Sequence, residues 1–211
     1  MNIRVCKRIA RMVLRPLLFH KNISMRPDGN SRNGLLALLQ KLSEYKTPIV
    51  MAEIGSYKGE SAEIFISSGI VSRLYCVDPW KPFYDDDDGA AFTNMRKVEE
   101  EFNSRHGDDP RVVKIKGTID DLVATVEESG LKLDFVYIDG CHTYDAVRYD
   151  LEVTFEKLKP AVAVGGHDYC EDGNGVFPGA GKAVREIVGR PDVVFKDTSW
   201  IKFNSLPEVI A

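Results

Sequence analysis

Short apolar segments alternate with amphipathic segments from residue 34 onward, and this alternation constrains the fold more than any other feature of the sequence. Apolar runs such as residues 48–55 are typical of strands that are buried on both faces. The segments between them have helical spacing, and several end in glycine, as at Gly107 and Gly130. Strands that alternate with helices form a mainly parallel sheet with helices on both faces. We therefore expect an α/β fold with seven strands, of which the last two form an antiparallel hairpin within residues 192–203.

The length and composition indicate one globular domain, which we place at residues 34–211. Hydrophobic residues make up 44% of the chain, enough for a packed core. The net charge of −4 argues against a nucleic-acid-binding protein. The four cysteines form no C-x-x-C pair, which favours reduced thiols in a cytoplasmic protein over zinc ligands or disulfides. No apolar run reaches the roughly 20 residues that a membrane-spanning helix needs.

Residues 1–33 are predicted to form a basic amphipathic helical extension. Arg15 and Pro16 interrupt its apolar stretch, which argues against a cleavable signal peptide. We expect this helix to pack on the domain or on a second subunit of a homodimer. The alternative is a peripheral contact with an anionic membrane surface. The apolar face carries Val5, Ile9, Met12 and Val13, and the basic face carries Arg4, Arg8, Arg11 and Arg15.

The turn after the first predicted strand has the pattern E-x-G-x-x-x-G, formed by Glu53, Gly55 and Gly59. Ligands of a parallel sheet bind beyond the carboxyl ends of its strands, and glycines there allow the backbone to approach a ligand closely. The acidic residue suits a ligand with a cation and a carboxylate better than the pyrophosphate of a dinucleotide, for which G-x-G-x-x-G is typical. The alternative is a plain strand–turn–helix connection without a ligand.

The next two strand ends carry further candidates for a nucleoside site. Asp78 follows the second strand, where a carboxylate can accept hydrogen bonds from a ribose diol. Gly117 and Thr118 follow the third strand, where they could border an adenine. The alternatives are an Asp-Pro turn at Asp78 and helix capping by Thr118 or Asp120.

Carboxylates and imidazoles follow the fourth and fifth predicted strands. Asp139 and His142 come after one, and His167 and Asp168 after the other. Because these strands are expected to be neighbours, the four side chains should converge, and together they could bind a divalent cation. The alternative is a pair of solvated turns with capping acids.

At these residues the sequence resembles the class I S-adenosylmethionine-dependent methyltransferases. It is most similar to the metal-dependent O-methyltransferases of the macrocin and cephamycin-biosynthesis type, the methyltransferase 24 group, and more distantly to the catechol O-methyltransferases. The resemblance covers roughly residues 47–203 and implies a Rossmann-like fold. It is carried by AEIGSYKGESA, YCVDPW, FVYIDGCHTYDAVRYDLEVTFEKLKP and GGHDY.

The resemblance implies a role for each matching residue. Asp139 and His142 would act in catalysis, His142 as the general base, and Mg²⁺ or Mn²⁺ would be bound by Asp139, His167 and Asp168. S-adenosylmethionine would be bound by Glu53, Gly55, Ser56, Tyr57, Gly59, Ser61, Asp78, Gly117, Thr118 and Asp139.

Two departures from the family pattern stand out. Ala161 and Val162 replace the usual Gly-Gly pair, and we expect only a packing change there. His167 is a poorer magnesium ligand than a carboxylate, so a softer ion such as Mn²⁺ is an alternative.

The resemblance implies methyl transfer to a hydroxyl of a small molecule or glycan, such as a sugar or secondary metabolite. Residues 79–92, with the acidic run Asp85–Asp88, are predicted to form a solvated, mobile loop, or alternatively a lid over the substrate. Three other functions are less consistent with these motifs. An oxidoreductase lacks support because the phosphate-type glycine motif is absent, and a metal-dependent hydrolase would not explain Glu53 and Asp78. A non-catalytic interaction protein would act through the basic helix.

Overall fold

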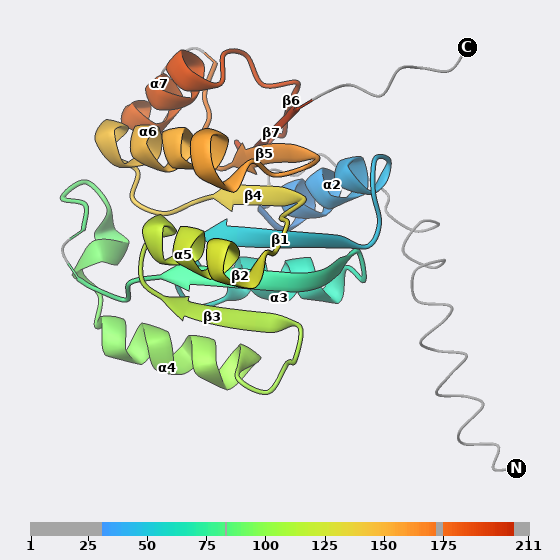
Figure 1. The fold of residues 1–211 in the computed structure, drawn as a ribbon. Coiled ribbons are helices and arrows are strands. Elements are labelled where there is room, and N and C mark those ends of the chain that lie inside the picture. The colour runs from blue at the N-terminus through green and yellow to red at the C-terminus, as the bar shows by residue number, and fades with distance from the viewer. Residues whose placement is uncertain (1–30, 83, 172–174, 205–211) are drawn as a thin grey trace, which may run out of the picture.

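The computed structural model describes residues 31–82, 84–171 and 175–204 (Figure 1). The predicted basic extension lies outside this part of the chain except for its last three residues, which belong to the first described helix. Its role on a membrane or in a dimer therefore stays a prediction. Within the described residues, no helix has both the length and the apolarity to cross a membrane.

Seven strands in the described residues form one sheet in the order β3-β2-β1-β4-β5-β7-β6 (Figure 1). The first five pair in parallel, whereas β7 runs antiparallel to both β5 and β6. The expected seven-stranded, mainly parallel sheet with a C-terminal antiparallel hairpin is confirmed. The strands are β1 (Ile49–Ile54), β2 (Val71–Asp78), β3 (Val112–Lys116), β4 (Phe135–Ile138), β5 (Ala163–Gly166), β6 (Val193–Val194) and β7 (Trp200–Phe203).

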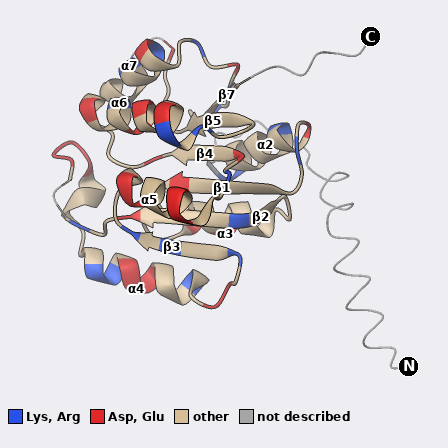
Figure 2. Cartoon of the chain, in the orientation of Figure 1, with Lys and Arg blue, Asp and Glu red and all other residues tan. Residues whose placement is uncertain are grey.

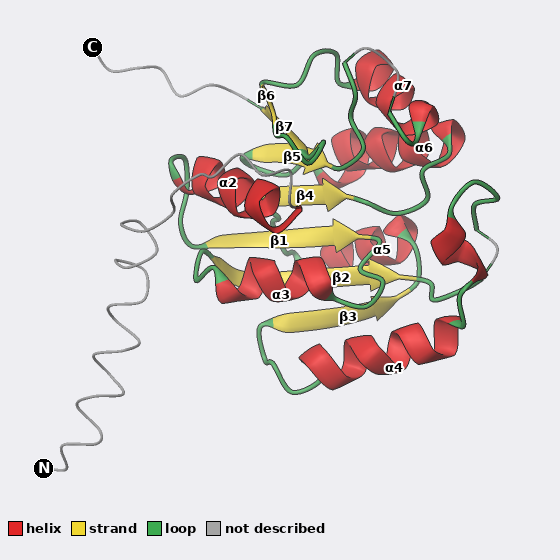
Figure 3. Cartoon of the chain, turned by 180° about the vertical axis from the view of Figure 1, so that it is seen from behind, coloured by secondary structure: helices red, strands yellow, loops and turns green. Residues whose placement is uncertain are grey.

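Helices cover both faces of the sheet, as Figures 1 and 3 show from opposite sides. One apolar cluster joins α2, α3 and α4 to the sheet, and a second joins α5, α6 and α7 to its other face. The sheet is buried between these layers, which explains its nearly continuous apolar strands. The helices are α2 (Ser31–Ser43), α3 (Glu60–Ser67), the 3₁₀ helix η1 (Gly89–Phe92), α4 (Met95–His106), α5 (Ile119–Ser129), α6 (Tyr144–Val153), the π-helical turn η2 (Thr154–Leu158) and α7 (Pro178–Ile187).

The parallel arrangement places the carboxyl ends of β1 to β5 at one edge of the sheet (Figure 3). The loop between β2 and α4 extends at this edge, and its acidic tip is the red loop at the left of Figure 2. Most of the residues singled out by sequence therefore follow strands that end at the same edge.

Candidate active site

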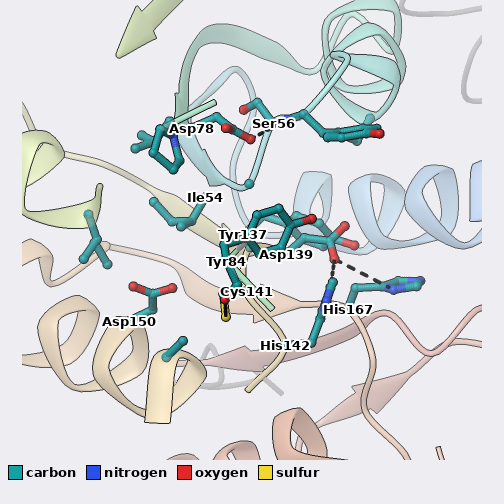
Figure 4. Close-up of a pocket in the computed structure, with 18 of the residues that line it drawn as sticks. Ile54, Ser56, Asp78, Tyr84, Tyr137, Asp139, Cys141, His142, Asp150 and His167 are labelled. Atoms are coloured by element: carbon teal, nitrogen blue, oxygen red, sulfur yellow. Dashed lines mark hydrogen bonds and ion pairs between the residues drawn. The ribbon is translucent and has the colours of Figure 1, made fainter. Parts of the chain in front are cut away.

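A pocket of about 630 Å³ opens at the carboxyl ends of β1, β2 and β4. Its walls come from the turn after β1, the loop after β2, the start of α5, the loop after β4 and one side of α6 (Figure 4). Three of the predicted site residues, Glu53, Gly59 and Asp168, do not line this pocket. The predicted residues that line it are Gly55, Ser56, Tyr57, Ser61, Asp78, Gly117, Thr118, Asp139, His142 and His167.

The turn after β1 approaches the loop after β4 so closely that it needs glycine at position 55. Gly55 has a φ of 92°, and a Cβ atom there would lie 2.1 Å from the carbonyl oxygen of Asp139. A side chain would therefore be strained both by the backbone conformation and by a clash. The next residue, Ser56, lines the pocket, and its hydroxyl oxygen has no hydrogen-bond partner among the described residues. This buried hydroxyl lies close to the Glu53 carboxylate and lowers its pKa.

Asp78, at the end of β2, is connected to the turn after β1 by hydrogen bonds. Its carboxylate oxygens accept hydrogen bonds from the backbone N–H groups of Tyr57, at 2.9 Å, and Trp80, at 2.6 Å. Burial raises the pKa of Asp78, while these two hydrogen bonds act in the opposite direction. Each carboxylate oxygen can accept a second hydrogen bond, so Asp78 can still receive one from a ribose hydroxyl in the pocket.

Glu53 lies beneath the turn, fully buried, rather than in the pocket wall. Burial raises the pKa of Glu53 to about 7, although the hydroxyl groups of Ser61 and Ser56 lower it. The Cys76 thiol on the neighbouring strand β2 lies 3.9 Å from the Glu53 carboxylate. Glu53 is thus placed to support the turn from below rather than to face a bound ligand.

Asp139, His142 and His167 lie at the other end of the pocket (Figure 4), and Asp168 lies beside them, within ion-pair distance of both imidazoles. Nε2 of His142 lies 3.2 Å from a carboxylate oxygen of Asp168 and 3.7 Å from one of Asp139. Nδ1 of His167 lies 3.2 Å from the other oxygen of Asp168 and 3.9 Å from Asp139. The two imidazoles therefore share the same pair of carboxylates.

One ligand atom from each of Asp139, His142 and Asp168 lies within 4.8 Å of the others, a spacing that fits a divalent cation. This set contains His142, whereas the resemblance implies His167 as the third ligand. His167 is adjacent to the same carboxylates, so its predicted role as a ligand stays a prediction.

The carboxylates control the charge of both imidazoles. Burial lowers the pKa of His142, but the hydrogen bond to Asp139 and the charges of Asp139, Asp168 and Asp88 outweigh it, so the net change is upward. The same balance, with Asp168 as the main partner, raises the pKa of His167 to about 9. Without another cation, these carboxylates favour protonated imidazoles.

The expectation of a solvated acidic loop is wrong for two of its four aspartates. Asp85 is only 5% exposed and accepts a hydrogen bond from the backbone N–H of His142. Asp88 accepts hydrogen bonds from the Tyr84 hydroxyl and the Ala90 N–H, and it lies 3.7 Å from Nδ1 of His142. These donors hold Asp85 against the loop after β4 and Asp88 in the pocket wall, whereas Asp86 and Asp87 stay exposed.

Sequence reasoning missed two residues that shape the pocket. The Phe177 ring stacks on the His142 imidazole, with centroids 4.0 Å apart, and fixes its orientation. Asp150 lines the pocket from α6 together with Ala146 and Tyr149. The spacing i, i+3, i+4 of these three residues was visible in the sequence as one helix face, but nothing in the sequence indicated that this face borders the pocket.

Comparisons with solved structures show the same fold at low sequence identity. The O-methyltransferase NovP is 13% identical, with a TM-score of 0.59 over 97% of this chain and 100% of that chain. CalS11, a TDP-rhamnose 3′-O-methyltransferase of calicheamicin biosynthesis, is 15% identical, with a TM-score of 0.58 over 98% and 100%. An O-methyltransferase from Bacillus cereus in complex with S-adenosylhomocysteine is 16% identical, with a TM-score of 0.51 over 92% and 89%. No curated protein sequence matches the chain.

The family model described as "Methyltransferase domain", of the methyltransferase 24 group, matches residues 52–169, which is more than half of the chain. The match extends from within β1 to just past the Asp/His cluster, and so contains both ends of the pocket. The chain belongs to this methyltransferase family and is a methyltransferase.

Proposed function

We propose that this protein is an S-adenosylmethionine-dependent O-methyltransferase that uses a divalent cation and methylates a hydroxyl of a sugar, glycan or secondary metabolite. The observation that carries the proposal is the pocket itself. A nucleoside-type site around Asp78 and an Asp/His cluster around Asp139 open into one cavity. Support for an oxygen acceptor comes from NovP and CalS11, which are named as O-methyltransferases.

Each part of S-adenosylmethionine has a candidate partner in the pocket. Asp78 accepts hydrogen bonds from the ribose hydroxyls, and Gly117 and Thr118 border the adenine. The amino-acid end lies along the turn after β1, formed by Gly55, Ser56, Tyr57 and Ser61, all of which line the pocket. Glu53 supports this turn from below, and Gly59, with a φ of 79°, ends it at the N-terminus of α3. Asp139, between the two halves of the pocket, borders both cofactor and acceptor.

Asp139 and Asp168 are the proposed cation ligands, with an imidazole as the third. A bound divalent cation would supply Lewis acidity that favours the alkoxide form of an acceptor hydroxyl. Nε2 of His142 cannot bind a cation and accept a proton at the same time. One imidazole of the pair His142 and His167 is thus the ligand, and the other accepts the hydroxyl proton. Sequence analysis favours His142 as the base, and its stacked, fixed ring suits that task.

In-line methyl transfer requires the acceptor oxygen to lie close to the methyl carbon, on the side opposite the sulfur that leaves as S-adenosylhomocysteine. The position of Asp139 between the cofactor half of the pocket and the imidazoles provides that alignment. Tyr84 and Phe177 border the same end of the pocket and would exclude water around the reacting atoms.

The first test is calorimetric titration of the purified protein with S-adenosylmethionine in the presence of Mg²⁺, Mn²⁺ or a chelator. We expect micromolar binding that survives chelation, because the proposed cofactor contacts come from the chain itself. Absence of binding under every condition would overturn the proposal.

The cation requires a second test, with acceptor sugars and secondary metabolites screened for methylation. Asp168→Asn should abolish turnover while sparing much of the cofactor binding, and Asp145→Asn on the exposed side of α6 serves as the matched control. Full activity of the Asp168→Asn protein with excess chelator present would eliminate the cation from the mechanism. His142→Gln and His167→Gln then separate the two imidazoles, because the ligand variant loses affinity for Mn²⁺ and the base variant does not.

A further inference from the structure

We propose that Asp150 recognises the exocyclic amino group of the adenine and thereby sets the base specificity of the cofactor site. This inference rests on the proposed function, because it presumes that an adenine nucleoside occupies the pocket. It adds a specificity-determining residue that the sequence did not indicate.

The Asp150 carboxylate points from α6 into the pocket (Figure 4). It is partly buried, and no described residue donates a hydrogen bond to it. Its acidic neighbour Asp120 differs, because the Tyr149 hydroxyl donates to both Asp120 oxygens, at 2.9 and 3.0 Å. A carboxylate that lines the pocket and has no donor among the described residues is available to a donor group of a ligand.

The surroundings of Asp150 suit a flat heterocycle. Ile54, Val77 and Ile119 are buried side chains that also line the pocket and offer apolar surface to the faces of a ring. Figure 4 shows Asp150, Ile54 and Asp78 in one half of the pocket and His142 and His167 in the other. A nucleoside whose ribose lies at Asp78 and whose sulfur faces the imidazoles would direct its base into the half that holds Asp150.

Adenine carries a hydrogen-bond donor for the Asp150 carboxylate, which receives none from the described residues. Its 6-amino group is a donor that a carboxylate can accept, whereas hypoxanthine has a 6-oxo group that would face the carboxylate oxygen to oxygen. Burial, reinforced by the charge of Asp120, raises the pKa of Asp150 to about 7. The protonated form could in addition donate its O–H to N1 of adenine while its carbonyl oxygen accepts from the amino group. The ionised form therefore favours adenine, whereas the protonated form can also pair with hypoxanthine by donating to its 6-oxo group and accepting from its N1–H.

The test compares the affinities for S-adenosylhomocysteine and S-inosylhomocysteine by calorimetry at about pH 8.5, above the raised pKa of Asp150, where its carboxylate is ionised. These two nucleosides differ only at the groups that Asp150 is proposed to distinguish. The wild-type protein should bind the adenine nucleoside at least about tenfold more tightly, as expected for loss of a hydrogen bond to a charged group. In Asp150→Ala this preference should fall towards unity, whereas Asp145→Ala, an exposed residue of the same helix, should keep it.

Asp150→Asn provides a second variant of the same shape in case the alanine protein does not fold. Its amide carbonyl accepts from adenine and its NH₂ donates to hypoxanthine, so binding of S-inosylhomocysteine should improve about tenfold or more. An unchanged preference in both folded variants would overturn the role of Asp150 while leaving the proposed function intact. If the wild-type protein binds neither nucleoside, the proposed function itself fails, and this inference fails with it.

Discussion

Replacement of the buried Glu53 by Gln should remove a pH dependence from the folding stability. The pKa of Glu53 is raised from its ordinary value of 4.5 to about 7 because the side chain is fully buried. A raised pKa means that the folded state holds the proton more tightly than the unfolded state. The resulting stabilisation is complete below pH 4.5 and is lost as the pH rises through about 7.

The size of this change in folding stability follows from the difference between the unfolded and folded pKa values of Glu53. Each pH unit between the unfolded and folded pKa values corresponds to about 1.4 kcal/mol, so ionised Glu53 lowers the free energy of unfolding by about 3 kcal/mol above pH 7. Gln has nearly the same shape but does not ionise. Any cost of placing its amide beside Cys76 should be the same at every pH. The stability of Glu53→Gln relative to the wild type should therefore rise by about 3 kcal/mol between pH 4.5 and 8.

Urea unfolding at several pH values, with a chelator present throughout, would measure this difference. Tryptophan fluorescence is a suitable probe because Trp80 and Trp200 are buried. Glu127→Gln, a substitution at an exposed position, controls for the loss of one negative charge. A stability difference that stays constant with pH would show that Glu53 ionises at no cost in the folded state. That result would refute the conclusion that Glu53 is shielded from water beneath the turn after β1.

Three further substitutions test the geometry of the site. Gly55→Ala should lower the urea midpoint by more than Gly69→Ala does, because both glycines have positive φ, 92° and 76°, but only Gly55 also faces backbone atoms within van der Waals distance. Asp78→Ala should weaken S-adenosylmethionine binding in calorimetry by at least about tenfold, and unchanged affinity would remove Asp78 from the ribose site. Asp88→Ala should lower kcat about tenfold with little change in cofactor affinity, because the carboxylate that faces Nδ1 of His142 is lost. Equal losses in cofactor affinity and kcat would instead indicate that the loop has collapsed.

The sequence was most informative where local pattern and topology act together. Apolar runs and helical periodicity predicted the seven-stranded α/β sheet, because these periods follow directly from backbone geometry. Parallel pairing then gathered Gly55, Asp78 and Asp139 at one edge of the sheet, since every parallel strand ends on the same side. The family match over residues 52–169 covers this same part of the chain.

Side-chain partners were decided by tertiary structure. The sequence ranked His167 above His142 as a third cation ligand, but the relative positions of two loops bring His142 into the group with Asp139 and Asp168. Charge density alone suggested that Asp85–Asp88 stays in water, and it could not show that the N–H of His142 would be available to Asp85.

The sequence by itself determined the fold class, the methyltransferase family and the edge of the sheet where the site lies. These depend on periodicity and on short motifs, which are local properties of the chain. Only the tertiary structure decided that Glu53 supports the turn from below, that Asp88 faces His142 and that Asp150 faces the pocket. Each of these depends on which segment packs against the residue, and a hydrophobic pattern does not specify the partner of a polar group.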